Sequence, residues 1–568
     1  MNFKKNLYTI SISAAMLAVA GCGITPQDEG LGDGSATPMS GVVVDGYLAG
    51  AVVYVDVNEN NKLDAWEKRA LTDTKGYFSY RPATTDQNGN AVAAINYCEL
   101  PETDSKFIHC LKAPSGYDEV IIRMTKGYDL ATAEPFTGTI SMKVNVSSSV
   151  IDTPMVATPV TGLLSEMSDE QRTQFLADEG LTADVAASDF LDLDNSLTAD
   201  QRRAMLNIAL KAHKVADVIA SLLDPEYAQN GASGFFGAEE GVPTDGSVYV
   251  YRAIASQISS TNKLSDILSD PTKLTDVISE AVTNINGVIS DYNDRLPHDL
   301  DTDELTNPED ALVAPTLGFT DISGIANKAL KIADTIETVF GTGVTLDESD
   351  QSTLSSDVIS RIRAIDAVVS LTRDGEAQAA VDNAVSLAGD AAYLANLRFA
   401  GVDMVSLKKK FVANPGAVVA ADADYSSRKS FDDLIGQNSA FTPSDPNGTV
   451  NPDGFAGNTL DLSKTNDGGT ASDSVKVDFT GDSPDAESGS LTIDATLLDG
   501  DFAKTDETGE PAPLELEGTW EKIDDYTMLM NIEVTDGVFE PVIVKPNEDG
   551  SGYYFDLGGE QIVWNPGS

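Results

Sequence analysis

The sequence is poor in the residue types on which most enzymes and cofactor sites depend. Only three histidines, three cysteines and three tryptophans occur in 568 residues. His109, His213 and His298 lie far from one another in the sequence, and His213, beside an apolar helical stripe, is interpreted as a core residue. The zinc motif H-E-x-x-H, the hydrolase motif G-x-S-x-G, the phosphate loop G-x-x-x-x-G-K-[ST] and the haem motif C-x-x-C-H do not occur. These absences argue against the commonest enzyme classes.

Basic residues are also scarce. The chain has 37 Lys and Arg against 90 Asp and Glu, a net charge of −53. Such a charge repels nucleic acid and anionic lipid surfaces, and cations or salt screen it. Among so many acids, no particular pair of carboxylates can be chosen as a glycosidase site, so this alternative stays open.

The N-terminus has the parts of a secretory signal peptide. Lys4 and Lys5 precede an apolar stretch at 7–20, which ends in Val19-Ala20-Gly21-Cys22. A membrane-spanning helix needs about 20 apolar residues, so this stretch is too short for a retained one. Small residues before a cysteine resemble the lipobox of bacterial lipoproteins. The resemblance implies a diacylglycerol on the Cys22 thiol, cleavage before Cys22, acylation of the new amine, with palmitate as a typical acyl chain, and anchoring to a membrane.

Gly23, which follows the cysteine, departs from the Asp that tends to hold lipoproteins at the inner membrane. The resemblance therefore favours the outer membrane, and leaves open whether the chain faces the periplasm or the cell surface.

The length and the 41% hydrophobic content predict two to four domains. We expect a multidomain α+β protein with an N-terminal β-sandwich, a central antiparallel helical bundle and a C-terminal antiparallel β-sandwich or barrel. The expected boundaries are 1–21 for the signal peptide, 22–40 for a Gly-rich tether, 41–152 for the β-sandwich, 153–430 for the helical domain and 431–568 for the C-terminal β-domain.

Residues 42–56 and 72–80 are rich in β-forming residues and are broken by glycines, which predicts short strands. This segment resembles prealbumin-like modules of bacterial surface proteins, related to carboxypeptidase regulatory-like domains and to calcium-binding adhesin B repeats. The resemblance covers about residues 41 to 150. It implies a surface location more clearly than an activity.

The sharpest motif is an acidic loop at 56–67. Oxygen-bearing side chains occupy positions 1, 3, 5, 9 and 12, the spacing of an EF-hand calcium loop. Position 6, normally glycine, is Asn61, and asparagine is among the residues that best tolerate the left-handed turn required there. The loop follows a strand, so we expect calcium to stabilise neighbouring strands, with a solvated acidic turn as the alternative. The predicted ligands are Asp56, Asn58, Asn60, the Lys62 carbonyl, Asp64 and Glu67.

Two other acidic segments carry weaker signals. Asp299, Asp301, Asp303, Asn307 and Asp310 have the same spacing but lack the turn residue and the final Glu. Residues 192–200 contain Asp192, Asp194, Ser196 and Asp200 just before an apolar stripe, where such residues commonly cap a helix. We interpret the second segment as capping.

Past Pro159 the apolar period changes from two to about 3.6, which predicts amphipathic helices. Short stripes separated by Gly-, Pro- and Asp-rich loops favour an antiparallel bundle. The five stripes are Met205–Leu222, Leu274–Tyr292, Ile322–Val339, Val358–Val369 and Val381–Phe399.

From about residue 440 the period returns to two, which predicts strands with one buried face. Trp520 follows the inward register of Leu514 and Leu516 and is expected in the core. Tyr526, Tyr554 and Trp564 are candidates for a ligand-binding, sugar-stacking surface, with core packing as the alternative.

Of the three cysteines, Cys22 is assigned to lipid, which leaves Cys98 and Cys110 as a pair. An oxidising compartment favours a disulfide between them, and two buried free thiols are the alternative.

Together these features predict a lipid-anchored surface lipoprotein, stabilised by calcium, that acts in adhesion, in binding a surface glycan or protein, or as a scaffold, and not as an enzyme. The alternative is a secreted hydrolase of polysaccharide or peptide with a carboxylate-based site. A deep cleft lined by carboxylates and aromatics would favour the enzyme.

Overall fold

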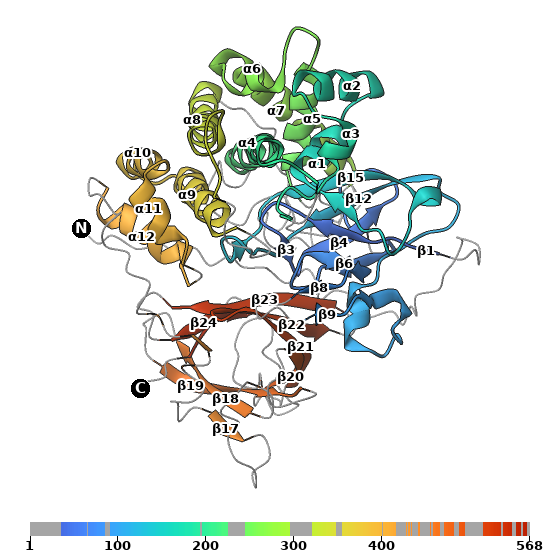
Figure 1. The fold of residues 1–568 in the computed structure, drawn as a ribbon, viewed down its shortest axis with the longest axis vertical. Helices are drawn as coiled ribbons and strands as arrows, with labels where there is room; N and C mark the ends of the chain where they lie inside the picture. The colour runs from blue at the N-terminus through green and yellow to red at the C-terminus, as the bar shows by residue number, and fades with distance from the viewer. Residues whose placement is uncertain are drawn as a thin grey trace, which may run out of the picture.

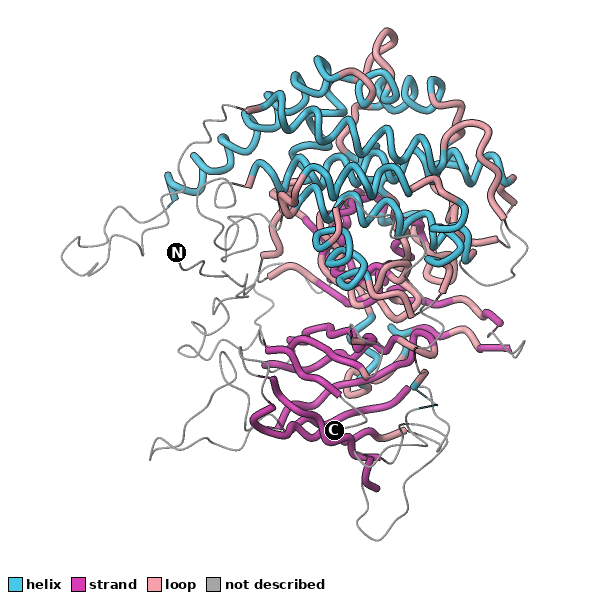
Figure 2. The backbone as a smooth tube through the Cα atoms, turned by 90° about the vertical axis from the view of Figure 1, so that its left-hand side faces the viewer, coloured by secondary structure: helices cyan, strands magenta, loops and turns pink. Residues whose placement is uncertain are grey.

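A computed structural model describes the chain at 36–64, 66–85, 91–193, 196–224, 245–295, 321–347, 355–399 and 401–415, and then in shorter pieces. These pieces are 428, 430, 431, 433, 441–443, 455, 458–465, 471–481, 488–494, 515–535, 538–547, 552–557 and 560–564. The protein is mixed α/β. Helices lie together on one side of the N-terminal sheets, and a curled C-terminal sheet lies on the other side (Figures 1 and 2).

The N-terminal region is built from short strands in several small sheets. A four-stranded antiparallel sheet has the order β15-β12-β4-β5, and a three-stranded sheet has the order β16-β2-β6, with β16 parallel to β2. Side chains of both sheets, such as Val53, Ile122, Val43 and Phe78, share one hydrophobic core. The strands are β1 (Thr37–Pro38), β2 (Gly41–Val43), β3 (Leu48–Ala49), β4 (Val52–Asp56), β5 (Arg69–Leu71), β6 (Tyr77–Phe78), β7 (Tyr80–Arg81), β8 (Thr84–Thr85), β9 (Ala91–Val92), β10 (Ile95–Asn96), β11 (Lys112–Ala113), β12 (Glu119–Thr125), β13 (Tyr128–Asp129), β14 (Glu134–Pro135), β15 (Thr139–Asn145) and β16 (Met155–Ala157), with 3-10 turns at Tyr97–Glu99, Ser105–His109 and Val146–Ser148.

The register of the four-stranded sheet brings three strand ends together. Asp56, the last residue of β4, pairs with Ile121 of β12, and Glu119, the first residue of β12, pairs with Asn145 of β15. The end of β4, the start of β12 and the end of β15 therefore lie at one end of the sheet, which we call the loop end because the acidic loop 56–67 leaves from it.

Helices begin directly after β16, where Thr158 caps α1 and forms a capping box with Thr161. The helices are α1 (Pro159–Ser165), α2 (Asp169–Asp178), α3 (Ala183–Ala186), α4 (Ala199–Leu223), α5 (Ser247–Gln257), α6 (Leu264–Leu268), α7 (Pro271–Arg295), α8 (Ile322–Phe340), α9 (Ser356–Arg373), α10 (Gln378–Leu387), α11 (Ala391–Leu397) and α12 (Met404–Ala413). Their core also includes Val42, Val44, Tyr47 and Ala131 of the N-terminal region, so helices and sheets pack as one body. Among the described helices, none is long and apolar enough to cross a membrane.

Four of the five predicted stripes lie in single helices, namely α4, α7, α8 and α9. The fifth is divided between α10 and α11. The break occurs at Gly389 and Asp390, where the Asp390 carboxylate accepts hydrogen bonds from the N–H groups of Ala392 and Tyr393 and so starts a new helix. The prediction of one helix over 381–399 was wrong because the apolar spacing continues through this cap.

The C-terminal strands form one antiparallel sheet in chain order. It curls until β25 pairs with β18, through Ser463 with Val563 and Lys464 with Ile562, and β17 pairs with the other half of β18. Alternate side chains, including Trp520 and Met530, fill the interior. The strands are β17 (Phe441–Pro443), β18 (Asn458–Thr465), β19 (Ala471–Phe479), β20 (Ser488–Asp494), β21 (Glu515–Asp524), β22 (Thr527–Thr535), β23 (Val538–Pro546), β24 (Tyr553–Leu557) and β25 (Glu560–Trp564).

The outer face of the curled sheet contacts the earlier parts of the chain. Lys545 Nζ donates a hydrogen bond of 2.7 Å to Glu134 Oε1, and Arg81 lies 3.5 Å from Glu521. Tyr526 packs against Phe399, with ring centroids 5.1 Å apart. The C-terminal sheet is therefore joined to both the N-terminal region and the helices.

Candidate functional sites

The acidic loop between β4 and β5 has a backbone that turns as the sequence motif requires. Asn61, at position 6, has a φ of 59°, and Glu59 has a φ of 58°. These are left-handed conformations, which asparagine tolerates better than most residues. The expectation that Asn61 would take the place of the usual glycine is confirmed for the backbone.

Asp56, at position 1, is buried and fully engaged by protein donors. Its Oδ1 accepts a hydrogen bond of 3.0 Å from Asn60 N, and its Oδ2 accepts one of 2.9 Å from Asn61 N. The buried guanidinium of Arg123 donates to the same Oδ2 over 2.5 Å. The positive charge that balances Asp56 thus comes from β12.

Glu67, at position 12, closes the loop. Its Oε1 accepts a hydrogen bond from Val57 N at 2.9 Å, and its Oε2 accepts one from Asp64 N at 3.1 Å. Burial, together with the charges of Asp56 and Asp64, raises the pKa of Glu67 to about 7, although the N–H groups of Val57 and Asp64 lower it. The surroundings of the Glu67 carboxylate therefore favour its protonated form.

The remaining candidates meet at Asp64. The side-chain amides of Asn58 and Asn60 each donate a hydrogen bond of 3.0 Å to Asp64 Oδ2. Lys62 contacts the loop through its backbone N–H, which donates a hydrogen bond of 2.8 Å to Asn60 Oδ1. The side chains of Asn58, Asn60 and Asp64 are therefore gathered over the loop.

Some features of the loop suit a calcium ion and others do not. The left-handed turn at Asn61 suits an oxygen-ligated cation. Asn58 and Asn60, however, turn their amide N–H groups toward Asp64, while their Oδ1 atoms accept hydrogen bonds from the N–H groups of Asn60 and Lys62. Asp56 and Glu67 also face protein donors, and within the described residues no three His, Cys, Asp or Glu side chains are grouped as metal ligands. A cation would have to compete with Arg123 and with backbone N–H groups for these two carboxylates.

The loop is coupled to the helical region. Asn61 Nδ2 donates a hydrogen bond of 3.1 Å to the carbonyl of Asp245, just before α5. Arg123 also lies 3.8 Å from Glu166, the C-cap of α1, and Glu166 accepts a hydrogen bond of 2.6 Å from Arg252 of α5. A change at Asp56 would therefore reach α1 and α5 through charged contacts.

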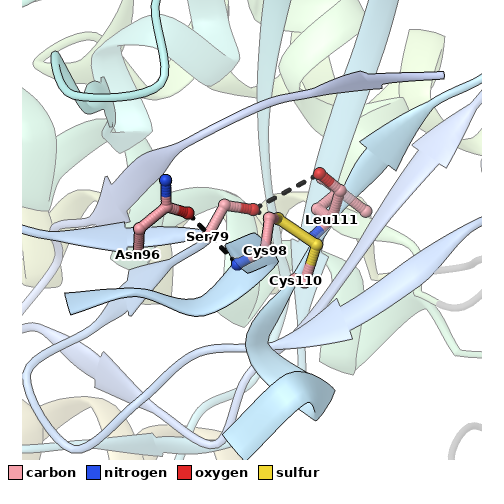
Figure 3. Close-up of a disulfide and its surroundings, with 5 residues drawn as sticks. All are labelled: Ser79, Asn96, Cys98, Cys110 and Leu111. Atoms are coloured by element: carbon pink, nitrogen blue, oxygen red, sulfur yellow. Dashed lines mark hydrogen bonds between the residues drawn. A yellow bond between two sulfur atoms is a disulfide. The ribbon is translucent and has the colours of Figure 1, made fainter. Parts of the chain in front are cut away.

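The structure joins Cys98 and Cys110 by a disulfide (Figure 3). Asn96 Oδ1 accepts a hydrogen bond of 3.2 Å from Cys98 N, and the Ser79 hydroxyl donates one of 3.3 Å to the carbonyl of Leu111, beside Cys110. These bonds fix the chain on both sides of the link. The disulfide in the purified protein is a prediction, and chemical analysis of its thiols distinguishes it from two free cysteines.

A buried cluster of charged groups between the sheets and α4 was not predicted from the sequence. Lys214 Nζ lies 3.2 Å from Asp45 Oδ2 and 3.9 Å from Asp366 Oδ1, and His213 Nε2 lies 3.7 Å from the same Asp45 oxygen. Burial raises the pKa of the neighbouring Asp129 to about 7, although Lys214 opposes the shift. No spacing in the sequence links these residues, because they come from four separate segments.

His213 lies in the core as expected, stacked on Phe136 with ring centroids 4.9 Å apart. Burial lowers its pKa, so it is neutral at pH 7. His109 is also buried, and its Nδ1 lies 2.9 Å from the carbonyl oxygen of Leu71. Neither imidazole is exposed to a substrate, and His298 lies outside the described residues.

The candidate aromatic residues do not form one platform. Tyr554 lies on the opposite face of its strand from Tyr553 and Phe555, but it is only 8% exposed, because that face packs against the rest of the chain with Lys545 Nζ 5.6 Å from the ring. Tyr526 packs on Phe399. The side chain of Trp564 lies outside the described residues. Trp520 is buried in the curled sheet, as expected.

Several predictions fall partly or wholly outside the described residues. These are the lipidation site Cys22, the second acidic segment at 299–310, and Asp194. In the 192–200 segment, Thr198 caps α4 and forms a capping box with Gln201, while Asp200 lies in the first turn. The prediction that this segment caps a helix is confirmed, but the capping residue is Thr198, which was not among the predicted residues.

No family model, curated protein or solved structure matches this chain.

Proposed function

We propose that the protein is an exported lipoprotein, anchored to the outer membrane through lipid on Cys22, that acts as a non-enzymatic binding, adhesion or scaffold protein. The observation that carries the proposal is the sequence Val19-Ala20-Gly21-Cys22 after a basic start and an apolar stretch. Two or more acyl chains would hold the chain stably at a membrane. The partner would be a surface glycan or another protein.

We further infer three domains: an N-terminal β-sandwich, an antiparallel helical bundle and a C-terminal barrel. Supporting this division, buried apolar residues fall into three clusters that follow the three regions. The shared core of the helices with Val42 and Val44 suggests that the first two domains fold as a pair.

Calcium is proposed as a structural ion of the 56–67 loop. The support is the spacing of the oxygen-bearing residues in the loop and the left-handed turn at Asn61. Bound there, an oxygen-ligated cation would offset the repulsion among Asp56, Asp64 and Glu67 and stabilise the connection between β4 and β5.

Neither of two cavities among the described residues is the deep cleft lined by carboxylates and aromatics that would favour the hydrolase alternative. A cavity of about 20 Å³ lies inside the curled sheet, and one of about 30 Å³ lies between that sheet and the N-terminal region. Small-molecule sites usually enclose about 300 to 1,000 Å³. Of the carboxylates around Lys214, Asp45 and Asp129 are buried in the core, and the Asp366 side chain is 14% exposed.

The test of the anchor is metabolic labelling with palmitate, followed by membrane fractionation. The wild-type chain should carry label and sediment with the outer membrane, whereas Cys22→Ser should do neither. Cys98→Ser is the matched control, since it removes a cysteine elsewhere. Label retained by Cys22→Ser would show that the anchor has been misassigned. The soluble chain that begins at residue 23 can then be used to capture surface glycans and proteins.

A further inference from the structure

Few large apolar side chains are exposed in the described part of the chain. They are Trp66 at 54%, Tyr117 at 36%, Val150 at 55% and Val412 at 40%. Single exposed apolar residues are normal on protein surfaces and need no explanation. What requires an explanation is that three of these four share one location.

Trp66, Tyr117 and Val150 all belong to segments at the loop end of the four-stranded sheet. Trp66 lies in the acidic loop that leaves β4 at Asp56, and Tyr117 lies two residues before β12 begins. Val150 follows the end of β15, where Val146 N donates a hydrogen bond of 2.9 Å to the Asp118 carbonyl. Neighbouring strands are about 4.8 Å apart, so the three segments are separated by a few strand widths.

The N-terminal tether leaves the fold at the same place. β1 pairs antiparallel with β11, with Thr37 opposite Ala113 and Pro38 opposite Lys112. Followed backwards from Thr37, the chain therefore starts out in the direction taken by residues 114–117, toward Tyr117. On the other side, the Ser40 hydroxyl donates a hydrogen bond of 2.6 Å to the carbonyl of Ile151, next to Val150.

The tether is short enough to keep this end near its anchor. Fourteen residue steps separate Cys22 from Ala36, the first described residue. Even fully extended, they span at most about 50 Å at roughly 3.5 Å per residue. Because the tether enters the fold at the loop end, this length limits the distance between that end and the lipid on Cys22.

We propose that the loop end of the N-terminal sheet docks onto the bilayer that holds the anchor, with Trp66, Tyr117 and Val150 at the lipid headgroups. The proposal rests on the proposed lipid anchor. Trp and Tyr are enriched at membrane interfaces because their rings are apolar and their N–H or O–H groups stay hydrated.

Tethering makes so small a contact effective. Three side chains would bind a free bilayer weakly, but a short linker gives an effective concentration in the millimolar range. The net charge of −53 works against anionic lipid, so the favoured surface is zwitterionic. Locally, Lys143 lies 2.9 Å from Glu119 and offsets its charge at this end of the sheet.

The experiment uses the mature chain from residue 23 with an N-terminal hexahistidine tag, held on phosphatidylcholine vesicles by a nickel-chelating lipid. Phosphatidylcholine brominated high in its acyl chains quenches tryptophans at the interface. We expect tryptophan emission to fall relative to vesicles without bromine, and we expect the drop to disappear in Trp66→Phe, which leaves Trp520 and Trp564 in place. Iodide in the water should quench Trp66 less on vesicles than in solution.

Tyr117→Ser and Val150→Ser should reduce the bromine quenching, whereas Val412→Ser, which removes an exposed apolar side chain on α12, should not. If iodide but not bromine quenches Trp66 in vesicle-bound protein, the loop end does not dock onto the bilayer. This result would not contradict the proposed lipid anchor. A failure of the proposed lipid anchor can also be distinguished from a failure of the docking. Absence of palmitate on Cys22 would remove the natural anchor, while bromine quenching of the tagged chain would still establish the docking surface.

Discussion

Arg123 of β12 donates a hydrogen bond to Asp56, the first residue of the acidic loop, over 2.5 Å in the protein interior. Both side chains are fully buried. Arg123 also donates to the Ser141 hydroxyl at 2.9 Å and lies near Glu166. This pair joins the loop, the four-stranded sheet and the helices, so a substitution of either residue should affect the stability of all three.

Arg123→Met should destabilise the calcium-free protein by roughly 3 to 5 kcal/mol, because it leaves the Asp56 charge buried without a partner. The double variant Asp56→Asn with Arg123→Met should recover part of this loss. Chemical denaturation of the mature chain in chelator measures both.

Arg172→Met is the matched control. Arg172 lies 3.0 Å from Asp169, whose side chain is almost fully exposed, and such surface pairs contribute about 0 to 1 kcal/mol. If Arg123→Met and Arg172→Met lower the denaturation midpoint equally, Arg123 does not hold the loop.

The Cys98–Cys110 link should be present in the exported protein and absent from protein made in a reducing cytoplasm. The closed loop spans 12 residues, for which chain entropy predicts a stabilisation of about 3 kcal/mol. Thiol labelling with mass spectrometry tests the bond. Denaturation of a Cys98→Ser, Cys110→Ser variant tests its contribution, and two labelled thiols in the exported wild type would refute the assignment.

Asp129 should make stability depend on pH. Burial raises its folded-state pKa to about 7, with Asp45 and Asp366 adding to the shift and Lys214 and the Ala131 N–H opposing it. Its ordinary pKa is about 4. The folded state therefore holds the extra proton, so this contribution is complete below about pH 4 and is lost as the pH rises through 7.

The stability of Asp129→Asn relative to wild type should increase as the pH is raised from 5 to 8, by roughly 1 kcal/mol for each pH unit below the folded-state pKa of Asp129. The comparison is denaturation of both proteins at pH 5 and pH 8. Asp334→Asn, the same change at an exposed carboxylate, is the control. Parallel behaviour of Asp129→Asn and Asp334→Asn across this range would contradict the assignment.

Periodicity identified most of the long elements of the fold. The stripes at 205–222 and 322–339 correspond to α4 and α8, because these helices bury one face against a large core. Short elements were missed. The helices α1, α3 and α6 span seven residues or fewer, too few for a helical period to be recognised. The closure of the curled sheet through β18 and β25 was also not predictable in detail, since it joins strands about 100 residues apart.

The candidate sites were likewise predictable where their residues are contiguous in the sequence and not where they come from distant segments. The acidic loop is contiguous, so its spacing and the turn at Asn61 were visible in the sequence. Arg123, which neutralises Asp56, lies 67 residues away and has no local signal. The burial of Tyr554 was likewise hidden, because alternation shows which face of a strand a residue is on but not what covers that face.

The calcium prediction now has to be tested on the whole mature chain. An isolated fragment of the N-terminal region would expose Val42, Val44 and Tyr47, which pack into the helical core. Stability should rise with free calcium as RT ln(1 + [L]/Kd), about 2.7 kcal/mol at a hundredfold excess over Kd. Extracellular modules of this kind bind calcium at roughly 0.1 to 1 mM. Thermal melting in millimolar calcium and in chelator measures the shift, and the emission of Trp66, next to Glu67, reports binding at the loop.

The informative variant is Asp64→Asn with Glu67→Gln, because it removes two ligand charges and leaves the Asp56–Arg123 pair intact. It should lose the calcium-dependent rise in melting temperature. Arg123→Met should show a larger rise than wild type, because the guanidinium that competes for Asp56 is gone and a bound cation supplies the missing positive charge. The same calcium dependence of melting in the wild type and in the Asp64→Asn, Glu67→Gln variant would show that the loop is not a calcium site.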